Sequence, residues 1–295
     1  MAQCQRSYAD RVAQCIKVDD LEYGDEELGL TVEYAIGFDL SQRVPYEFMV
    51  DGLPRHLAAG LVRAAGFVPG CDGADAGWDS WQKVPAWTGP DEEQTGVLIQ
   101  VANFLCQYQT LIRRRNFSRE HMRQIMQGRL ETEPLDWYAV NERDADLVWQ
   151  VYRAHLRERL ATLGPAQAGI ELANGFGVAD LVCGRTLLDV KTVVAPPEDC
   201  RQWLRQLAAY YLLDADDTFE IDSVGVVLPR QAAVITWDLD EVFSREALTD
   251  LAGLRREAAA IAAAVQDRIA ADERRRKQAT AEHKQARAAT PTAAT

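Results

Sequence analysis

The chain has 295 residues, of which 47% are hydrophobic and 26% charged, values typical of a globular protein. It carries 45 acidic against 32 basic side chains, and a formal charge of −13 disfavours nonspecific attraction to nucleic acid. The sequence has no uninterrupted apolar run of about 18 residues, which argues against a membrane span. The first residues, MAQCQRSYADRV, lack the apolar core of a secretory signal, so we expect a cytoplasmic protein that does not bind membranes.

The chain is predicted to begin with a helix, and residues 41–165 to be mostly helical. Tyr8 and Val12 have the spacing of an opening amphipathic helix. Residues 28–40 are compatible with a helix or a strand, and a helix beginning near Gly29 is preferred. Further helices are predicted at 56–67, 92–115 and 141–163, with one more beginning at Ser118. Residues 68–92 are rich in Gly, Pro and Asp and are predicted to form an irregular loop. We interpret residues 41–165 as a large helical insertion in a domain that spans 1–245.

The pattern becomes β-rich after residue 177. The runs 178–182 and 186–194 are separated by Cys183-Gly184-Arg185 and are predicted to form a hairpin. A helix at 198–213 and two strands at 221–228 and 233–237 should come next. This order predicts an α/β fold with a mixed central sheet flanked by helices. A C-terminal helix is expected at 246–271, and a disordered, charge-rich tail at 272–295.

Three charged residues fall within the otherwise apolar hairpin. Asp180 lies in its first strand, and Asp189 and Lys191 lie in its second. Asp189 and Lys191 share one side of their strand because side chains alternate, and the short turn brings Asp180 close to Asp189. Two buried carboxylates need a cation between them, and oxygen ligands suit a hard divalent ion such as Mg²⁺. Such a site could support metal-assisted phosphodiester hydrolysis.

A structural ion pair between Lys191 and one of the two aspartates is the alternative interpretation of these three residues. The helix predicted at 198–213 favours the interpretation as a metal site instead. Gln206 and Tyr210 are four residues apart and therefore share a face next to the apolar stripe that packs on the sheet. From there both could hydrogen-bond Lys191 or a substrate phosphate.

The stretches ADLVCGRTLLDVKT and WLRQLAAYYLLD resemble the RecB-like branch of the PD-(D/E)xK nuclease superfamily. That branch carries an Asp, then an acid-x-Lys, then a helix with Gln-x-x-x-Tyr. Five residues occupy these positions in order: Asp180, Asp189, Lys191, Gln206 and Tyr210. The strand pair VGVVLPRQAAVITW also resembles the strands that come after that helix in such proteins. The resemblance covers about 65 residues and implies a restriction-endonuclease-like core.

By this resemblance, Asp180, Asp189 and the Val190 carbonyl would bind the metal, and Lys191 would position the attacking water. Gln206 and Tyr210 would support the site or contact the DNA backbone. The family also has an acid on an early helix, for which Glu33 in GLTVEYAIGF is the first candidate and Glu171 the competitor. The chain departs from the family in two ways, because Asp189 stands where Glu is commoner and the early-helix motif matches poorly.

The resemblance implies a nuclease that depends on Mg²⁺ or Mn²⁺, with DNA rather than RNA as the expected substrate. The alternative function is a catalytically inactive nuclease fold that serves as a nucleic-acid-binding or protein-assembly module. Residues 251–295 carry nine basic and five acidic side chains, which leaves a charge of −17 on residues 1–250. An acidic body of this kind predicts weak, salt-sensitive affinity for DNA, or a protein partner that delivers it.

Overall fold

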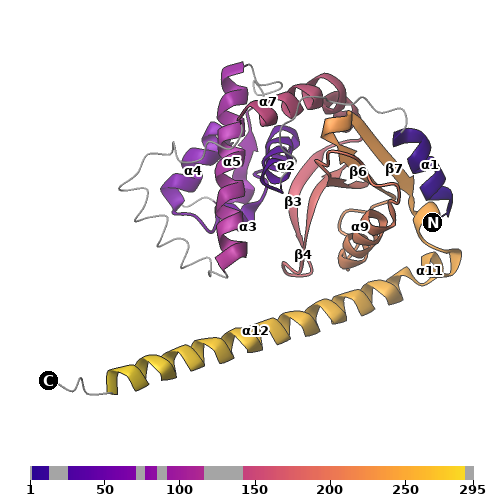
Figure 1. Ribbon diagram of the computed structural model, residues 1–295. Coiled ribbons are helices and arrows are strands. Elements are labelled where there is room, and N and C mark those ends of the chain that lie inside the picture. Colours follow the sequence, from indigo (N-terminus) through magenta and orange to yellow (C-terminus); the bar gives the residue numbers. More distant parts are fainter. Residues whose placement is uncertain (1, 13–25, 71–76, 85–91, 116–141, 290–295) are drawn as a thin grey trace.

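A five-stranded mixed sheet forms the centre of the protein (Figure 1). The computed structural model describes residues 2–12, 26–70, 77–84, 92–115 and 142–289. The strands lie in chain order: β3 (Ala166–Leu172), β4 (Gly177–Cys183), β5 (Thr186–Val190), β6 (Ser223–Leu228) and β7 (Ala233–Asp238). All neighbours are antiparallel except β5 and β6, which are parallel and joined by helix α9 (Arg201–Leu213). The predicted α/β fold with a mixed sheet is therefore confirmed.

Helices cover both faces of the sheet, and each face has its own hydrophobic cluster. On the first face pack α2 (Glu26–Leu40), α3 (Glu47–Val50), α4 (Arg55–Ala64), α5 (Glu92–Arg115), α7 (Glu142–Val151) and α8 (Arg157–Thr162). On the second pack α1 (Ala2–Val12), α9 and α12 (Leu251–Ala289). Adjacent residues of one strand pack into the clusters on opposite faces of the sheet; in β5, Leu187 belongs to the second cluster and Leu188 to the first. Figure 1 shows α2 and α5 on one side of the sheet and α9 on the other, with α12 extending away from the body.

Helix α2 is the centre of the first cluster. Its apolar residues are buried around the whole circumference, among them Val32, Ala35, Ile36 and Phe38, each with 0% exposure. A helix that is apolar on all sides is stable only inside a protein, where it is enclosed by other elements. The described helices of residues 41–165 supply this enclosure, because they share one hydrophobic cluster with α2 and the sheet.

Charged side chains fix the C-terminal end of α2. Asp39 is fully buried, and its Oδ2 accepts hydrogen bonds from Tyr152 Oη (2.6 Å) and from Arg157 Nε (2.8 Å). Tyr152 lies in a π-helical segment, Tyr152–Leu156, that connects α7 to α8. Lys83 donates a hydrogen bond to the main-chain oxygen of Phe38, and burial lowers the pKa of this lysine to about 7. These contacts hold α2 in register with the helices around it.

Several elements differ from the predictions. No strand was expected at 166–172, where β3 forms the edge of the sheet, because AQAGIEL is poor in β-branched and aromatic residues. The predicted loop at 68–92 contains a small hairpin, β1 (Phe67–Pro69) with β2 (Trp81–Lys83). The C-terminal region forms α10 (Leu239–Val242), α11 (Arg245–Thr249) and then α12, which continues to Ala289 where a disordered tail was expected from 272. Its Ala, Glu, Lys and Arg content explains this, because these residues favour helix. The helix expected from Ser118 lies outside the described residues.

Two further sequence expectations concern compartment and membranes. The cysteines that the structure describes, Cys4, Cys106, Cys183 and Cys200, are free and buried. Among the described helices, none combines the length and the apolar character that crossing a bilayer requires.

The β4–β5 turn provides a test of the fold. Gly184 has φ +58°, and a Cβ there would collide with the carbonyl oxygen of Leu163. We therefore expect Gly184→Ala to lower the free energy of unfolding by about 1–3 kcal/mol, since it combines a left-handed backbone with a steric clash. Gly60 in α4 has no atom within 4 Å of the position that a Cβ would take, so Gly60→Ala should be neutral or stabilise by about 0.5–1 kcal/mol. Chemical denaturation of both variants checks this, and equal stabilities would contradict the close packing at the turn.

Candidate functional site

Asp180 and Asp189 stand where strands β4 and β5 separate. The β4–β5 ladder runs from Cys183↔Thr186 to Leu181↔Leu188, and the two aspartates would form the next pair in register. The ladder does not continue to them. Instead the side chain of Asp180 accepts a hydrogen bond of 2.8 Å from the backbone N–H of Val190. The carboxylate of Asp180 thus takes the place of a backbone partner and keeps the two strands apart at this end.

Lys191 follows directly after β5 and forms an ion pair with Asp189. Its Nζ lies 2.5 Å from Asp189 Oδ2, and the exposed fraction is 1% for the Asp189 side chain and 22% for Lys191. The backbone N–H of Lys191 donates to Val227 O of β6 at 2.8 Å. This bond extends the parallel β5–β6 pairing by one residue and fixes the main chain from which Lys191 projects. The ion pair that the sequence offered as an alternative to chemistry is therefore present.

Gln206 of α9 connects the charged residues to one another. Its Nε2 donates to Asp189 Oδ1 and lies within hydrogen-bond distance of Tyr210 Oη, both at 3.1 Å. Its Oε1 accepts from Lys191 Nζ, also at 3.1 Å. Gln206 and Tyr210 reach the hairpin together because residues four apart share one face of a helix. The structure thus brings together all five residues of the sequence pattern: Asp180, Asp189, Lys191, Gln206 and Tyr210.

Of the two candidates for the early acid, Glu33 lies near Asp180. Burial raises the pKa of Asp180 well above its usual value, and the next contribution comes from the charge of Glu33. Gly29 lies one helical turn before Glu33 on the same face of α2. A Cβ added at Gly29 would lie 3.9 Å from Thr192 Cβ, so this face of α2 is directed towards the residues that follow β5. Glu171 instead lines a pocket beside β3 together with Glu47, whose pKa it helps to raise.

Tyr46 packs between α2 and β3, close to Glu33 and Asp180. Its hydroxyl donates to Glu33 O at 3.2 Å, and its ring fills the space beside Gly169, where any Cβ would collide with it. Tyr46 has φ +55°, an uncommon conformation for a bulky residue. Burial raises the pKa of Tyr46 well above its usual value, and the charges of Glu33 and Asp180 add to this.

The ionisable groups of the site shift one another's pKa values. Burial raises the pKa of Asp189, although Lys191 opposes the effect. Burial lowers the pKa of Lys191, but the ion pair with Asp189 outweighs it, so that the ammonium form is favoured. Lys191 therefore pairs directly with Asp189, whereas the charge of Glu33 adds to the burial that raises the pKa of Asp180.

This donor set suits a hard divalent cation in part. Mg²⁺ is commonly held by one or two carboxylates and keeps several waters, and Asp180 with Asp189 meets that requirement. In an extended strand the N–H and C=O of one residue point to the same side, so we expect the Val190 carbonyl, like its N–H, to face Asp180. Within the described ranges, however, no group of three or more His, Cys, Asp or Glu side chains is close enough to hold a metal.

Two residues near the site were not found from the sequence. Gln231, in the turn after β6, donates from Nε2 to Val193 O (2.9 Å) and Val194 O (3.2 Å), and so holds the segment that comes after Lys191. Thr192 is the neighbour of Gly29 described above. Neither belongs to a spacing pattern, because their roles depend on contacts between distant segments.

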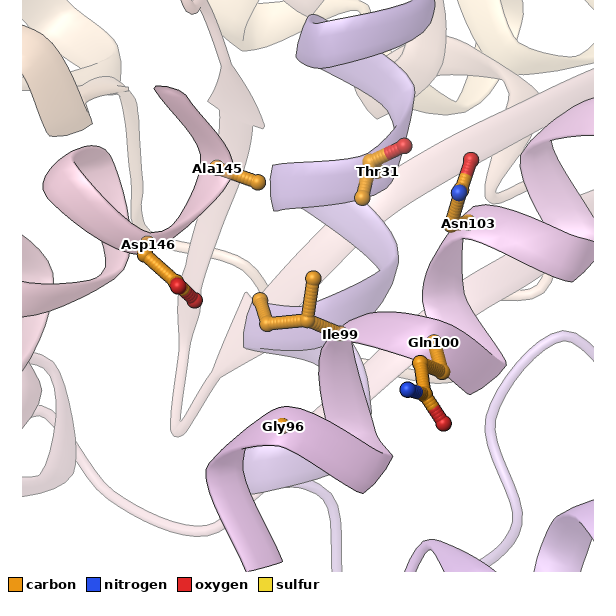
Figure 2. A pocket seen from close by; sticks show the side chains of 7 residues that line it. All are labelled: Thr31, Gly96, Ile99, Gln100, Asn103, Ala145 and Asp146. Carbon is orange, nitrogen blue, oxygen red and sulfur yellow. The ribbon is translucent and has the colours of Figure 1, made fainter. Parts of the chain in front are cut away.

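A separate pocket lies between α2, α5 and α7 and is lined by Thr31, Gly96, Ile99, Gln100, Asn103, Ala145 and Asp146 (Figure 2). Residues two apart on a helix do not share a face, so Thr31 is directed away from the side of α2 that carries Glu33. The pocket is therefore not part of the carboxylate site.

A search of protein-family models gives no match to this chain, and neither the curated proteins nor the solved structures show significant similarity to it.

The crowded carboxylates make a prediction about stability. Because the pKa of Asp180 is raised in the folded state, its contribution to stability is present below about pH 4 and is lost as the pH rises through the raised pKa. The substitution Asp180→Asn removes this loss of stability at high pH, and the new amide oxygen can still accept the hydrogen bond from the backbone N–H of Val190. In metal-free buffer at pH 9 we expect Asp180→Asn to have a higher free energy of unfolding than the wild type, and at low pH the same one.

Asp189→Asn is the matched comparison, because it leaves Lys191 without its buried partner. We expect it to lower the free energy of unfolding by up to about 3 kcal/mol at pH 7. Thermal and denaturant unfolding across pH 4–9 measure both variants. A wild type more stable than Asp180→Asn at pH 9 would show that Asp180 carries no excess charge.

Proposed function

We propose that the protein is a metal-dependent nuclease that hydrolyses DNA phosphodiester bonds at the end of β5. The observation that carries this proposal is the convergence of Asp180, Asp189 and Lys191 with Gln206 and Tyr210, with Glu33 facing the same spot. These residues have the order of the RecB-like PD-(D/E)xK pattern in the sequence, which also favours a restriction-endonuclease-like core. The proposal would place the protein in the cytoplasm, with DNA as its partner.

In this proposal Asp180, Asp189 and the Val190 carbonyl hold Mg²⁺ or Mn²⁺. A bound divalent ion lowers the pKa of water and neutralises charge that develops on a phosphate. Lys191 is held between Asp189 and Gln206, and from this position its ammonium group orients the attacking water. Tyr210 and Gln206 keep the lysine and the carboxylate in place. Glu33 adds a further carboxylate on the α2 side.

Cleavage of linear single- and double-stranded DNA with Mg²⁺ tests the proposal. We expect Lys191→Met and Asp180→Asn to reduce the rate by at least about 100-fold, because each removes a group that acts on the reacting atoms. Asp180→Asn is the more informative variant, since the loss of activity should accompany unchanged or higher stability. Metal-dependent cleavage that persists in both variants would refute the assignment.

Glu33 and Glu171 provide an internal comparison in the same assay. Glu33→Gln should reduce cleavage strongly, because Glu33 lies near Asp180. Glu171→Gln should leave it within about twofold of the wild type, since Glu171 lies beside Glu47 in a different pocket. The reverse result would assign the early acid to Glu171.

A second function is a catalytically inactive nuclease fold that binds nucleic acid or assembles with protein. Two observations favour it: Asp189 is already compensated by Lys191, and the described residues contain no group of three metal-binding side chains. Calorimetric titration with Mg²⁺ separates the two functions. The nuclease predicts binding that disappears in Asp180→Asn, whereas the inactive module predicts no binding that depends on Asp180.

A further inference from the structure

Thr192, which comes directly after Lys191, has a buried hydroxyl group without a hydrogen-bond partner. Its Oγ1 is not accessible to solvent and contacts no donor or acceptor among the described residues. Burying an unpaired hydroxyl costs about 1–3 kcal/mol, so such groups in folded proteins require an explanation. The residue as a whole is half-buried. Because the residue is not fully enclosed, rotation of its side chain between staggered positions can expose Oγ1 to a ligand.

The space next to Thr192 is left open by a glycine. Gly29 lies inside helix α2, where glycine is less favourable than alanine by roughly 0.5–1 kcal/mol. Thr192 Cβ, at 3.9 Å, is the nearest atom that a Cβ at Gly29 would meet, which is an ordinary contact distance. A side chain at position 29 would thus be tolerated by the backbone but would occupy the space beside Thr192. The gap lies on the face of α2 that also carries Glu33.

Lys191 and Thr192 come directly after β5, and their contacts place them on different sides of the chain. Lys191 lies on the α9 side with Asp189 and Gln206, which occupy its ammonium group. Thr192 lies on the α2 side, near Gly29. A nucleic-acid strand bound at the end of β5 would therefore meet the carboxylates of Asp180 and Asp189 and, on the α2 side, the Thr192 hydroxyl.

We propose that Thr192 Oγ1 donates a hydrogen bond to a phosphate oxygen of the bound nucleic-acid strand, and so is a substrate-binding residue of the site. The inference rests on the proposed nuclease function. Hydroxyl groups of Ser and Thr are common phosphate ligands, and a neutral donor adds a contact without bringing another charge into the site. A phosphate beside Asp180 and Glu33 needs such donors, since both carboxylates repel it.

Thr192→Val and Thr192→Ser form a matched pair, because valine keeps the shape and removes the hydroxyl, whereas serine keeps the hydroxyl. For cleavage of a linear DNA with Mg²⁺ we expect Thr192→Val to raise KM about tenfold with little change in kcat, as for the loss of one hydrogen bond to a charged group. Thr192→Ser should stay within about twofold of the wild type. The thermal midpoint of Thr192→Val should equal or exceed that of the wild type, because the lost hydroxyl has no partner among the described residues.

Binding of a labelled oligonucleotide, measured by fluorescence anisotropy in the Lys191→Met background, gives a second readout that does not need cleavage. The added Thr192→Val substitution should weaken this binding about tenfold. If KM and binding stay unchanged while Lys191→Met and Asp180→Asn abolish cleavage, the role of Thr192 is refuted and the nuclease assignment stands. A lower thermal midpoint for Thr192→Val would also refute it, since the hydroxyl would then have a structural role. A wild type that neither cleaves nor binds DNA would overturn both proposals.

Discussion

Asp189 is buried at the end of β5, with the half-buried Asp180 and Glu33 close by, and the need to hold these carboxylates near one another constrains the structure around them. Two groups near them supply neutral hydrogen bonds. The backbone N–H of Val190 binds Asp180, and the amide of Gln206 binds Asp189. These bonds hold the carboxylates in place without compensating their charge. A divalent cation would supply that compensation, which is why the folded state without one should gain stability when Asp180 becomes neutral.

The site draws its residues from elements that belong to both hydrophobic clusters. Gln206 and Tyr210 come from α9, which belongs to one cluster, and Glu33 comes from α2, which belongs to the other. Helix α2 can present Glu33 to the sheet only if its own position is fixed. The burial of its apolar residues and the bonds of Asp39 to Tyr152 and Arg157 provide this. The described helices of residues 41–165, a range interpreted from the sequence as an insertion, thus help to place a residue of the site.

Local patterns predicted much of the fold and of the site, and contacts between distant segments account for the rest. The β4–β5 hairpin is predicted by two β-rich runs around Cys183-Gly184-Arg185, and the phase of α9 by the spacing of Gln206 and Tyr210. Strand β3 has no such signal, because its small residues become a strand only by pairing with β4. Likewise, the sequence left Glu33 and Glu171 as alternatives, since the position of α2 over the sheet depends on the packing of the whole first cluster. Thr192 and Gln231 were missed for the same reason.

The proposed function depends above all on the binding of a divalent cation by Asp180 and Asp189. A crystal structure grown with Mn²⁺ and measured at the manganese absorption edge tests this binding most directly. We expect an anomalous peak coordinated by carboxylate oxygens of Asp180 and Asp189 and by the Val190 carbonyl, with Lys191 displaced from Asp189 or retained beside a coordinated water. The absence of a peak there, with the Lys191–Asp189 ion pair unchanged, would contradict the proposed metal site.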